Sequence, residues 1–196
     1  MPRGARSIQP QIIANGAGTS CLSIWDTVNL MTCRGGYSMP RDRFNPAQAQ
    51  EVAVAFAAHQ VDYMFIGKSG AILLGYPGTT QDVDLYPRKD FENGIRIVAG
   101  LRDLGFLIDN RLEEEIISGK DFIQIKSGPF DIDLVFAPDG IESYEKAKSR
   151  MDVSSGFPVL SIRDIIASKR SAGRPRDAVE LPLLEAFREV YENLGK

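Results

Sequence analysis

Short runs of apolar or alternating residues predict the strands of a small sheet. Runs of this length, with every second residue apolar, are typical of strands rather than helices. Gly67 stops the first run before it reaches helical length, and turn residues at 127–129 separate two later runs into a predicted hairpin. The runs lie at residues 63–66, 82–85, 122–126 and 130–136, with a further candidate at 157–160 and a short one at 106–108.

Longer amphipathic segments between these runs predict helices, several with recognisable capping residues. Asn45, Asp90 and Ser161 are well placed as N-caps, and Ile95, Val98 and Leu101 predict the buried stripe of the helix after Asp90. The charged segment 110–119 predicts a solvated turn. The predicted helices cover residues 45–59, 71–74, 90–104, 142–150, 161–172 and 174 onward, the last kinked or divided at Pro182.

This order of elements predicts an α/β fold: a small mixed β-sheet with helices mainly on one face, followed by C-terminal helices. Residues 1–38 differ from the rest, because they are rich in Gly, Ser, Thr, Asn and Arg and contain only one short apolar patch. We therefore expect residues 1–38 to be a poorly ordered N-terminal extension and residues 39–196 to be one domain.

The composition argues against several classes of function. A net charge of −3 argues against nucleic-acid binding through a uniformly basic surface, although a local basic cleft stays open. His59 is the single histidine, so neither a Ser-His-Asp arrangement nor a site with several histidines is available. Two cysteines and the lack of any apolar run of membrane-spanning length predict a cytoplasmic protein with free thiols that does not enter a membrane.

The strand at 82–85 contains two carboxylates, Asp82 and Asp84. Residues two apart on a strand share a face, so both carboxylates point the same way and repel each other unless a cation lies between them. Mg²⁺ is a hard cation that prefers such oxygen ligands. An Asp-x-Asp pair alone is more typical of a solvated strand face, so the glycine turn that precedes it decides the interpretation.

The glycine turn, short helix and Asp-x-Asp strand together resemble the nucleotidyltransferase signature of the DNA polymerase beta superfamily. Within it, the segment is most similar to the AbiEii-type nucleotidyltransferases. Three positions depart from the pattern: Lys68 stands where glycine or serine is usual, Gly70 where alanine is usual, and Gly78 where arginine is usual. The matching residues are Gly67, Gly75, Pro77, Thr80, Asp82, Asp84 and Leu85.

The resemblance implies a catalytic, metal-binding trio of carboxylates with Mg²⁺ as cofactor. Asp82 and Asp84 would supply two of them, and the third would lie on the neighbouring strand. Asp133 matches the Ile-Asp-Leu segment of the pattern, and Asp131 on the same strand face remains the alternative.

The resemblance also implies a site for the nucleotide. A later helix with a lysine, followed by Arg-x-x-Asp, matches the pattern at Lys169, Arg174 and Asp177, although the last two can also simply pair and tie two helices together. Lys68 either adds a charge to the phosphate site or blocks it. The nucleotide-binding residues would be Gly67, Lys68, Ser69, Thr80 and Lys169.

The function that follows is transfer of a nucleoside monophosphate from an NTP to an acceptor hydroxyl on an RNA, a protein or a small molecule. The departures at Lys68 and Gly78 leave an alternative: a catalytically weak or inactive member that binds a nucleotide or a partner. Such a member would belong to a toxin–antitoxin-like pair and bind an antitoxin-like protein.

Overall fold

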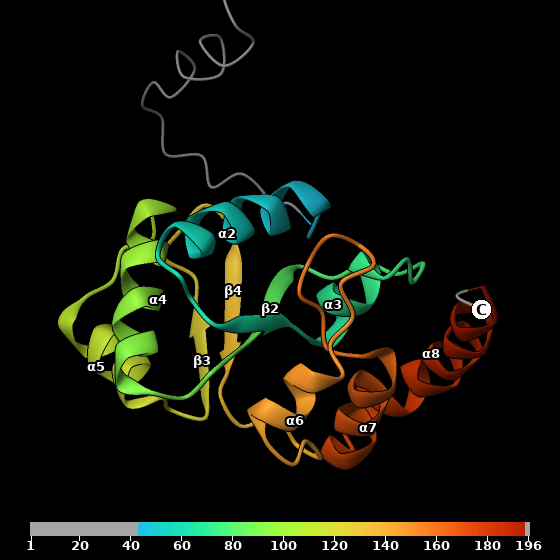
Figure 1. Ribbon diagram of the computed structural model, residues 1–196. Coiled ribbons are helices and arrows are strands. Elements are labelled where there is room, and N and C mark those ends of the chain that lie inside the picture. The colour runs from blue at the N-terminus through green and yellow to red at the C-terminus, as the bar shows by residue number, and fades with distance from the viewer. Residues whose placement is uncertain (1–42, 195–196) are drawn as a thin grey trace, which may run out of the picture. The chain divides into compact units, whose positions relative to one another are not determined.

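The computed structural model of this chain describes residues 43–194. The predicted extension at residues 1–38 and both cysteines lie outside this range. Within the range, four strands and seven helices form a mixed α/β structure (Figure 1). This confirms the predicted fold class, with a small mixed sheet and C-terminal helices.

The sheet has the strand order β1-β2-β4-β3. The two central strands are parallel, and each outer strand is antiparallel to its neighbour, so the predicted hairpin of β3 and β4 is confirmed. Residues 157–160 form only isolated bridges, in which Val159 pairs with Phe65 and Asp152. The strands are β1 (Tyr63–Phe65), β2 (Asp82–Pro87), β3 (Phe122–Ile125) and β4 (Asp131–Val135).

Helix boundaries follow the capping residues closely. The side chains of Asn45, Asp90 and Ser161 each accept a hydrogen bond from a backbone N–H in the first turn of the helix that follows, as predicted. The helices are α2 (Pro46–Ala58), α3 (Gly67–Leu73), α4 (Phe91–Asp103), α5 (Asn110–Ser118), α6 (Tyr144–Ser149), α7 (Ile162–Ala172) and α8 (Pro175–Leu194).

Several sequence predictions are wrong in instructive ways. The charged segment 110–119 is helix α5, because Asp109 caps it and Ile116 is buried beneath its charged surface. Residues 106–108 are not a strand, and α8 continues through Pro182 without being divided. On α4 the buried stripe contains Ile97, which is 0% exposed, whereas Ile95 is 43% exposed.

The two faces of the sheet have different chemistry. Alternation in β2, β3 and β4 buries one set of side chains completely or nearly so: Val83, Leu85, Ile123, Ile125, Ile132 and Leu134. The opposite face bears carboxylates from β2 and β4. Apolar burial therefore fixes the orientation of both strands and, with it, the direction of those carboxylates.

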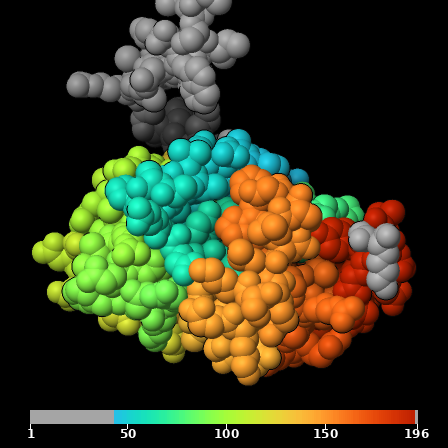
Figure 2. All heavy atoms as spheres, in the orientation of Figure 1, coloured from blue at the N-terminus to red at the C-terminus, as the bar shows by residue number. Residues whose placement is uncertain are grey.

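The segment between α6 and α7 closes part of the interior. The Phe65 amide donates to the Pro158 carbonyl at 2.7 Å, and the Leu160 amide donates to the Phe65 carbonyl at 2.8 Å. In the space-filling view this segment, in orange, adjoins α2 at the surface (Figure 2). This segment therefore bonds the edge of β1 that β2 does not occupy.

Among the described residues, no helix combines the length and the apolar character needed to cross a bilayer.

The corrected stripe of α4 gives a stability prediction. Ile97→Ala should lower the free energy of unfolding by about 2–5 kcal/mol, because it opens a cavity in the core. Ile95→Ala, on the same helix, should cost less than about 1 kcal/mol, since this side chain is largely in water. Urea denaturation of both variants measures the difference. Equal losses would contradict the burial of α4 described above.

Candidate metal centre

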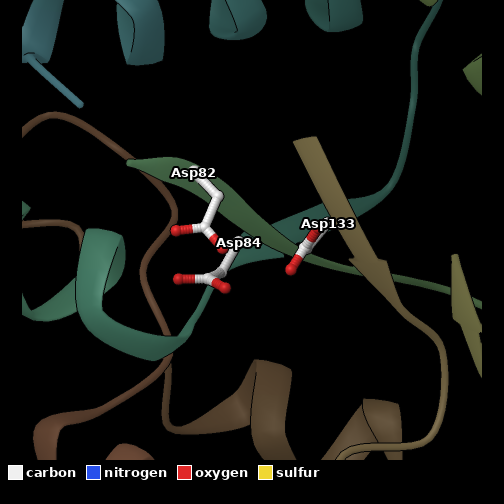
Figure 3. A group of neighbouring side chains, drawn as sticks. All are labelled: Asp82, Asp84 and Asp133. Atoms are coloured by element: carbon white, nitrogen blue, oxygen red, sulfur yellow. The ribbon is translucent and has the colours of Figure 1, made fainter. Parts of the chain in front are cut away.

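Three carboxylates meet on the polar face of the sheet. Asp82 and Asp84 come from β2, and Asp133 comes from the adjacent strand β4. One oxygen from each lies within 4.8 Å of the others, and Figure 3 shows all three side chains directed into the same space. The structure thus brings together the three carboxylates that the sequence predicted.

The register of the parallel pair distinguishes Asp133 from Asp131. Asp84 lies opposite Asp133 and Asp82 lies opposite Asp131. Among the described residues, the three-carboxylate group contains Asp133 and not Asp131. Asp133 is only 7% exposed, and its Oδ1 has no hydrogen-bond partner in the described part of the chain. A buried carboxylate oxygen without a donor is costly, so this oxygen fits a site that a cation completes.

Burial and the proximity of other carboxylates raise the pKa of Asp84 and of Asp133. Burial raises the pKa of Asp84 to about 7, and the charges of Asp82 and Asp133 add to this effect. The Ser69 amide and the Lys169 ammonium oppose it. Burial also raises the pKa of Asp133, again with a contribution from Asp82. Without a cation, the group therefore favours a partly protonated state at neutral pH.

The donor set suits a hard divalent cation. All three groups are carboxylates, they lie on two hydrogen-bonded strands, and one buried oxygen has no partner among the described residues. Mg²⁺ binds such oxygens, typically together with water and substrate phosphates. Asp82, Asp84 and Asp133 could hold this ion between β2 and β4.

Two hydroxyl side chains position the carboxylates. The Ser69 Oγ accepts a hydrogen bond from the Asp84 amide at 2.9 Å, and the Ser69 amide donates to Asp84 Oδ2 at 3.4 Å. The Thr80 hydroxyl donates to Asp82 Oδ1 at 2.7 Å. The sequence predicted Ser69 and Thr80 as nucleotide contacts, which stays a prediction; in the structure both side chains also bond residues of the three-carboxylate group.

Position 67 requires a glycine because of its backbone conformation and because Asp84 lies close to it. Gly67 begins α3 with φ of +59°, which L side chains rarely adopt, and a Cβ there would lie 2.6 Å from Asp84 Oδ2. Glycine therefore lets the start of α3 lie against the carboxylate.

A cleft of about 930 Å³ opens onto the three carboxylates. Lys68 and Tyr76 lie along it near α3, while Lys169 of α7 and Arg174, Arg176 and Glu180 also line it. Both predicted phosphate-binding lysines are therefore in the same cleft as the carboxylates.

The two lysines are engaged by acidic residues of α8. Lys68 Nζ lies 2.7 Å from Glu180 Oε1, and Lys169 Nζ donates to Glu180 Oε2 at 2.8 Å and to Asp177 Oδ1 at 3.2 Å. Asp177 thus binds Lys169, the lysine on α7. Glu180 is not among the residues that the sequence predicted for the site. Its spacing of three residues from Asp177 places both acids on one helical face, and this was the available signal.

Two of the positions that depart from the family pattern are neighbours in space. A Cβ on Gly78 would lie 2.7 Å from the Tyr76 ring and 3.2 Å from Lys68 Cε. A large side chain at position 78 would therefore displace Lys68 or Tyr76. The glycine at position 78 therefore leaves the space that the Lys68 side chain occupies.

No family model matches this chain, and neither does any curated protein. The resemblance to the AbiEii-type nucleotidyltransferases therefore stays a prediction, based on the motif residues and on the site they form.

Gly67 and Gly75 offer a matched pair of substitutions. Gly75 also has a positive φ, of +101°, but no described atom lies within 4 Å of its missing Cβ. Gly75→Ala should cost only the backbone strain, about 1–2 kcal/mol. Gly67→Ala should cost roughly 1–3 kcal/mol more, because it also collides with Asp84. Chemical denaturation measures both, and equal losses would exclude the close approach to Asp84.

The raised pKa of Asp84 predicts how stability depends on pH. Because the folded state binds this proton more tightly than the unfolded state, the associated stability is present below about pH 4 and is lost as pH rises towards 7. Mg²⁺ should therefore raise Tm more at pH 8 than at pH 5.5.

Asp84→Asn is the control for this prediction. It removes one of the repelling charges, so it should raise the metal-free Tm at pH 8 by roughly 3 °C and weaken the response to Mg²⁺. Thermal unfolding with Mg²⁺ and with EDTA provides the measurement. A Mg²⁺ response that is the same at both pH values, or unchanged in Asp84→Asn, would contradict a metal site at these carboxylates.

Proposed function

We propose that this chain is a Mg²⁺-dependent nucleotidyltransferase of the AbiEii type, within the DNA polymerase beta superfamily. It would transfer a nucleoside monophosphate from an NTP to an acceptor hydroxyl and release pyrophosphate. The observation that carries the proposal is the group of three carboxylates on adjacent parallel strands, with the glycine that begins α3 packed against one of them.

The residues have distinct parts in this proposal. Asp82 and Asp84 would hold the metal, with Thr80 and Ser69 fixing their orientation. Bound Mg²⁺ would neutralise phosphate charge and assist deprotonation of the acceptor hydroxyl. Asp133 faces the pair from β4, where it would complete the metal site and would be placed to accept the proton of the acceptor hydroxyl.

The cleft supplies room and positive charge for a triphosphate. Its volume of about 930 Å³ is at the upper end of typical ligand sites and accommodates a nucleotide together with an acceptor group. Of the described residues that line it, Lys68, Lys169, Arg174 and Arg176 are cationic. Phosphoryl transfer depends mainly on positioning and charge neutralisation, and this is what such a cleft offers.

A specific observation supports the second candidate, a weak or inactive member that binds a nucleotide or an antitoxin-like partner. Both lysines of the cleft are already paired with Glu180, so a triphosphate has to compete for them. Binding without transfer would favour this candidate.

Transfer can be tested with each labelled NTP and Mg²⁺, using RNA, protein and small hydroxylated molecules as acceptors, with mass spectrometry as the readout. Asp84→Ala and Asp133→Asn should lower the rate at least about 100-fold. Asp131→Asn is the matched control, since Asp131 is on the same strand but outside the three-carboxylate group, and it should retain most of the activity. Equal activity in Asp84→Ala and wild type would overturn the proposal.

A further inference from the structure

Glu180 connects two helices of the cleft through its two carboxylate oxygens. Oε1 lies 2.7 Å from the Nζ of Lys68, at the start of α3, and Oε2 lies 2.8 Å from the Nζ of Lys169, on α7. Glu180 itself is on α8, so its carboxylate links α8 to both α3 and α7. Of the described residues that line the cleft, Lys68 and Lys169 are the only lysines.

This cluster is shielded from water. The side chains of Glu180 and Lys169 are only 14% and 15% exposed, and that of Lys68 is 33% exposed. Ion pairs in such surroundings are screened less than pairs at the surface, so each partner strongly favours keeping an opposite charge nearby. Moving Glu180 away would break the ion pair of Lys68 and leave Lys169 with Asp177, so it is unfavourable unless another anion takes its place.

The metal centre lies within electrostatic reach of the same cluster. The three carboxylates, the two lysines and Glu180 all line the same cleft. A polyphosphate bound to a cation at those carboxylates would extend into the cleft that Lys68 and Lys169 line. The oxygens of such a ligand are negatively charged hydrogen-bond acceptors, as are those of the Glu180 carboxylate.

We propose that Glu180 is an internal anion that holds Lys68 and Lys169 in the empty cleft, and that the phosphates of the incoming triphosphate replace it. This inference rests on the proposed function and adds a regulatory residue to its substrate site. Glu180 thereby lowers affinity for phosphate ligands and couples ligand binding to the contacts of α8 with α3 and α7.

The proposal also accounts for Lys68, for which the sequence left two roles open. Lys68 neither blocks the site nor contributes a free charge in the empty protein. It is held by Glu180 until phosphate arrives, and its aliphatic stem passes next to Gly78.

The test measures binding of inorganic tripolyphosphate by calorimetry, at low salt and in EDTA, to the full chain. Glu180→Gln keeps the size of the side chain and removes the charge, so affinity should rise roughly tenfold. Glu180→Asp keeps the charge but is one methylene shorter and cannot span both lysines equally, so it should give a smaller increase. Lys68→Ala added to Glu180→Gln should remove most of the gain.

Glu185→Gln is the matched control on the same helix. Glu185 pairs with Arg170, and it does not line the cleft, so affinity should not change. Unchanged or weaker binding in folded Glu180→Gln, or in Glu180→Asp where Glu180→Gln does not fold, would overturn the proposal. Because this assay needs no metal and no transfer, its failure is separate from failure of the nucleotidyltransferase activity.

Discussion

The parallel pairing of β2 with β4 is the constraint on which the site depends. It places Asp84 opposite Asp133, and the buried side chains of Val83, Leu85, Ile132 and Leu134 prevent either strand from shifting by one residue. A one-residue shift would place the carboxylates in the apolar core. The hydrophobic face therefore maintains a group of like charges that would otherwise separate. Burial, with a contribution from the charges of Asp82 and Asp133, raises the pKa of Asp84.

Local patterns predicted those parts of the fold that local chemistry determines. Strand alternation and capping residues located the four strands and the ends of α2, α4 and α7, because each depends on neighbours within a few residues. The segment 110–119 was misassigned since its three glutamates concealed Leu112 and Ile116, which are four apart and lie on one helical face. On α4 the choice between Ile95 and Ile97 depended on which side packs inward, and this is decided by the tertiary structure.

The candidate site likewise has parts that local sequence patterns predict and parts that depend on tertiary packing. The Asp-x-Asp spacing predicted only that Asp82 and Asp84 share one strand face, whereas the metal site and its third carboxylate, Asp133, came from the resemblance. The partners of those residues could not be predicted, because Ser69, Thr80 and Glu180 meet the site only after α3, β2 and α8 have packed. The sequence predicted Ser69 and Thr80 as nucleotide contacts but gave no sign of the hydrogen bonds that their hydroxyl groups form with Asp84 and Asp82.

Charge balance links these observations. The three carboxylates that line the cleft need positive charge, and the two lysines that line it need negative charge. The charges of the two groups are balanced in different ways. At the carboxylates the pKa of Asp84 and of Asp133 is raised and one buried oxygen has no partner among the described residues, whereas the lysines are neutralised by Glu180 and Asp177. A ligand that pairs a divalent cation with a polyphosphate satisfies both groups at once, because its cation suits the carboxylates and its phosphates suit the lysines. This charge distribution supports the proposal that the cleft binds a nucleoside triphosphate together with Mg²⁺.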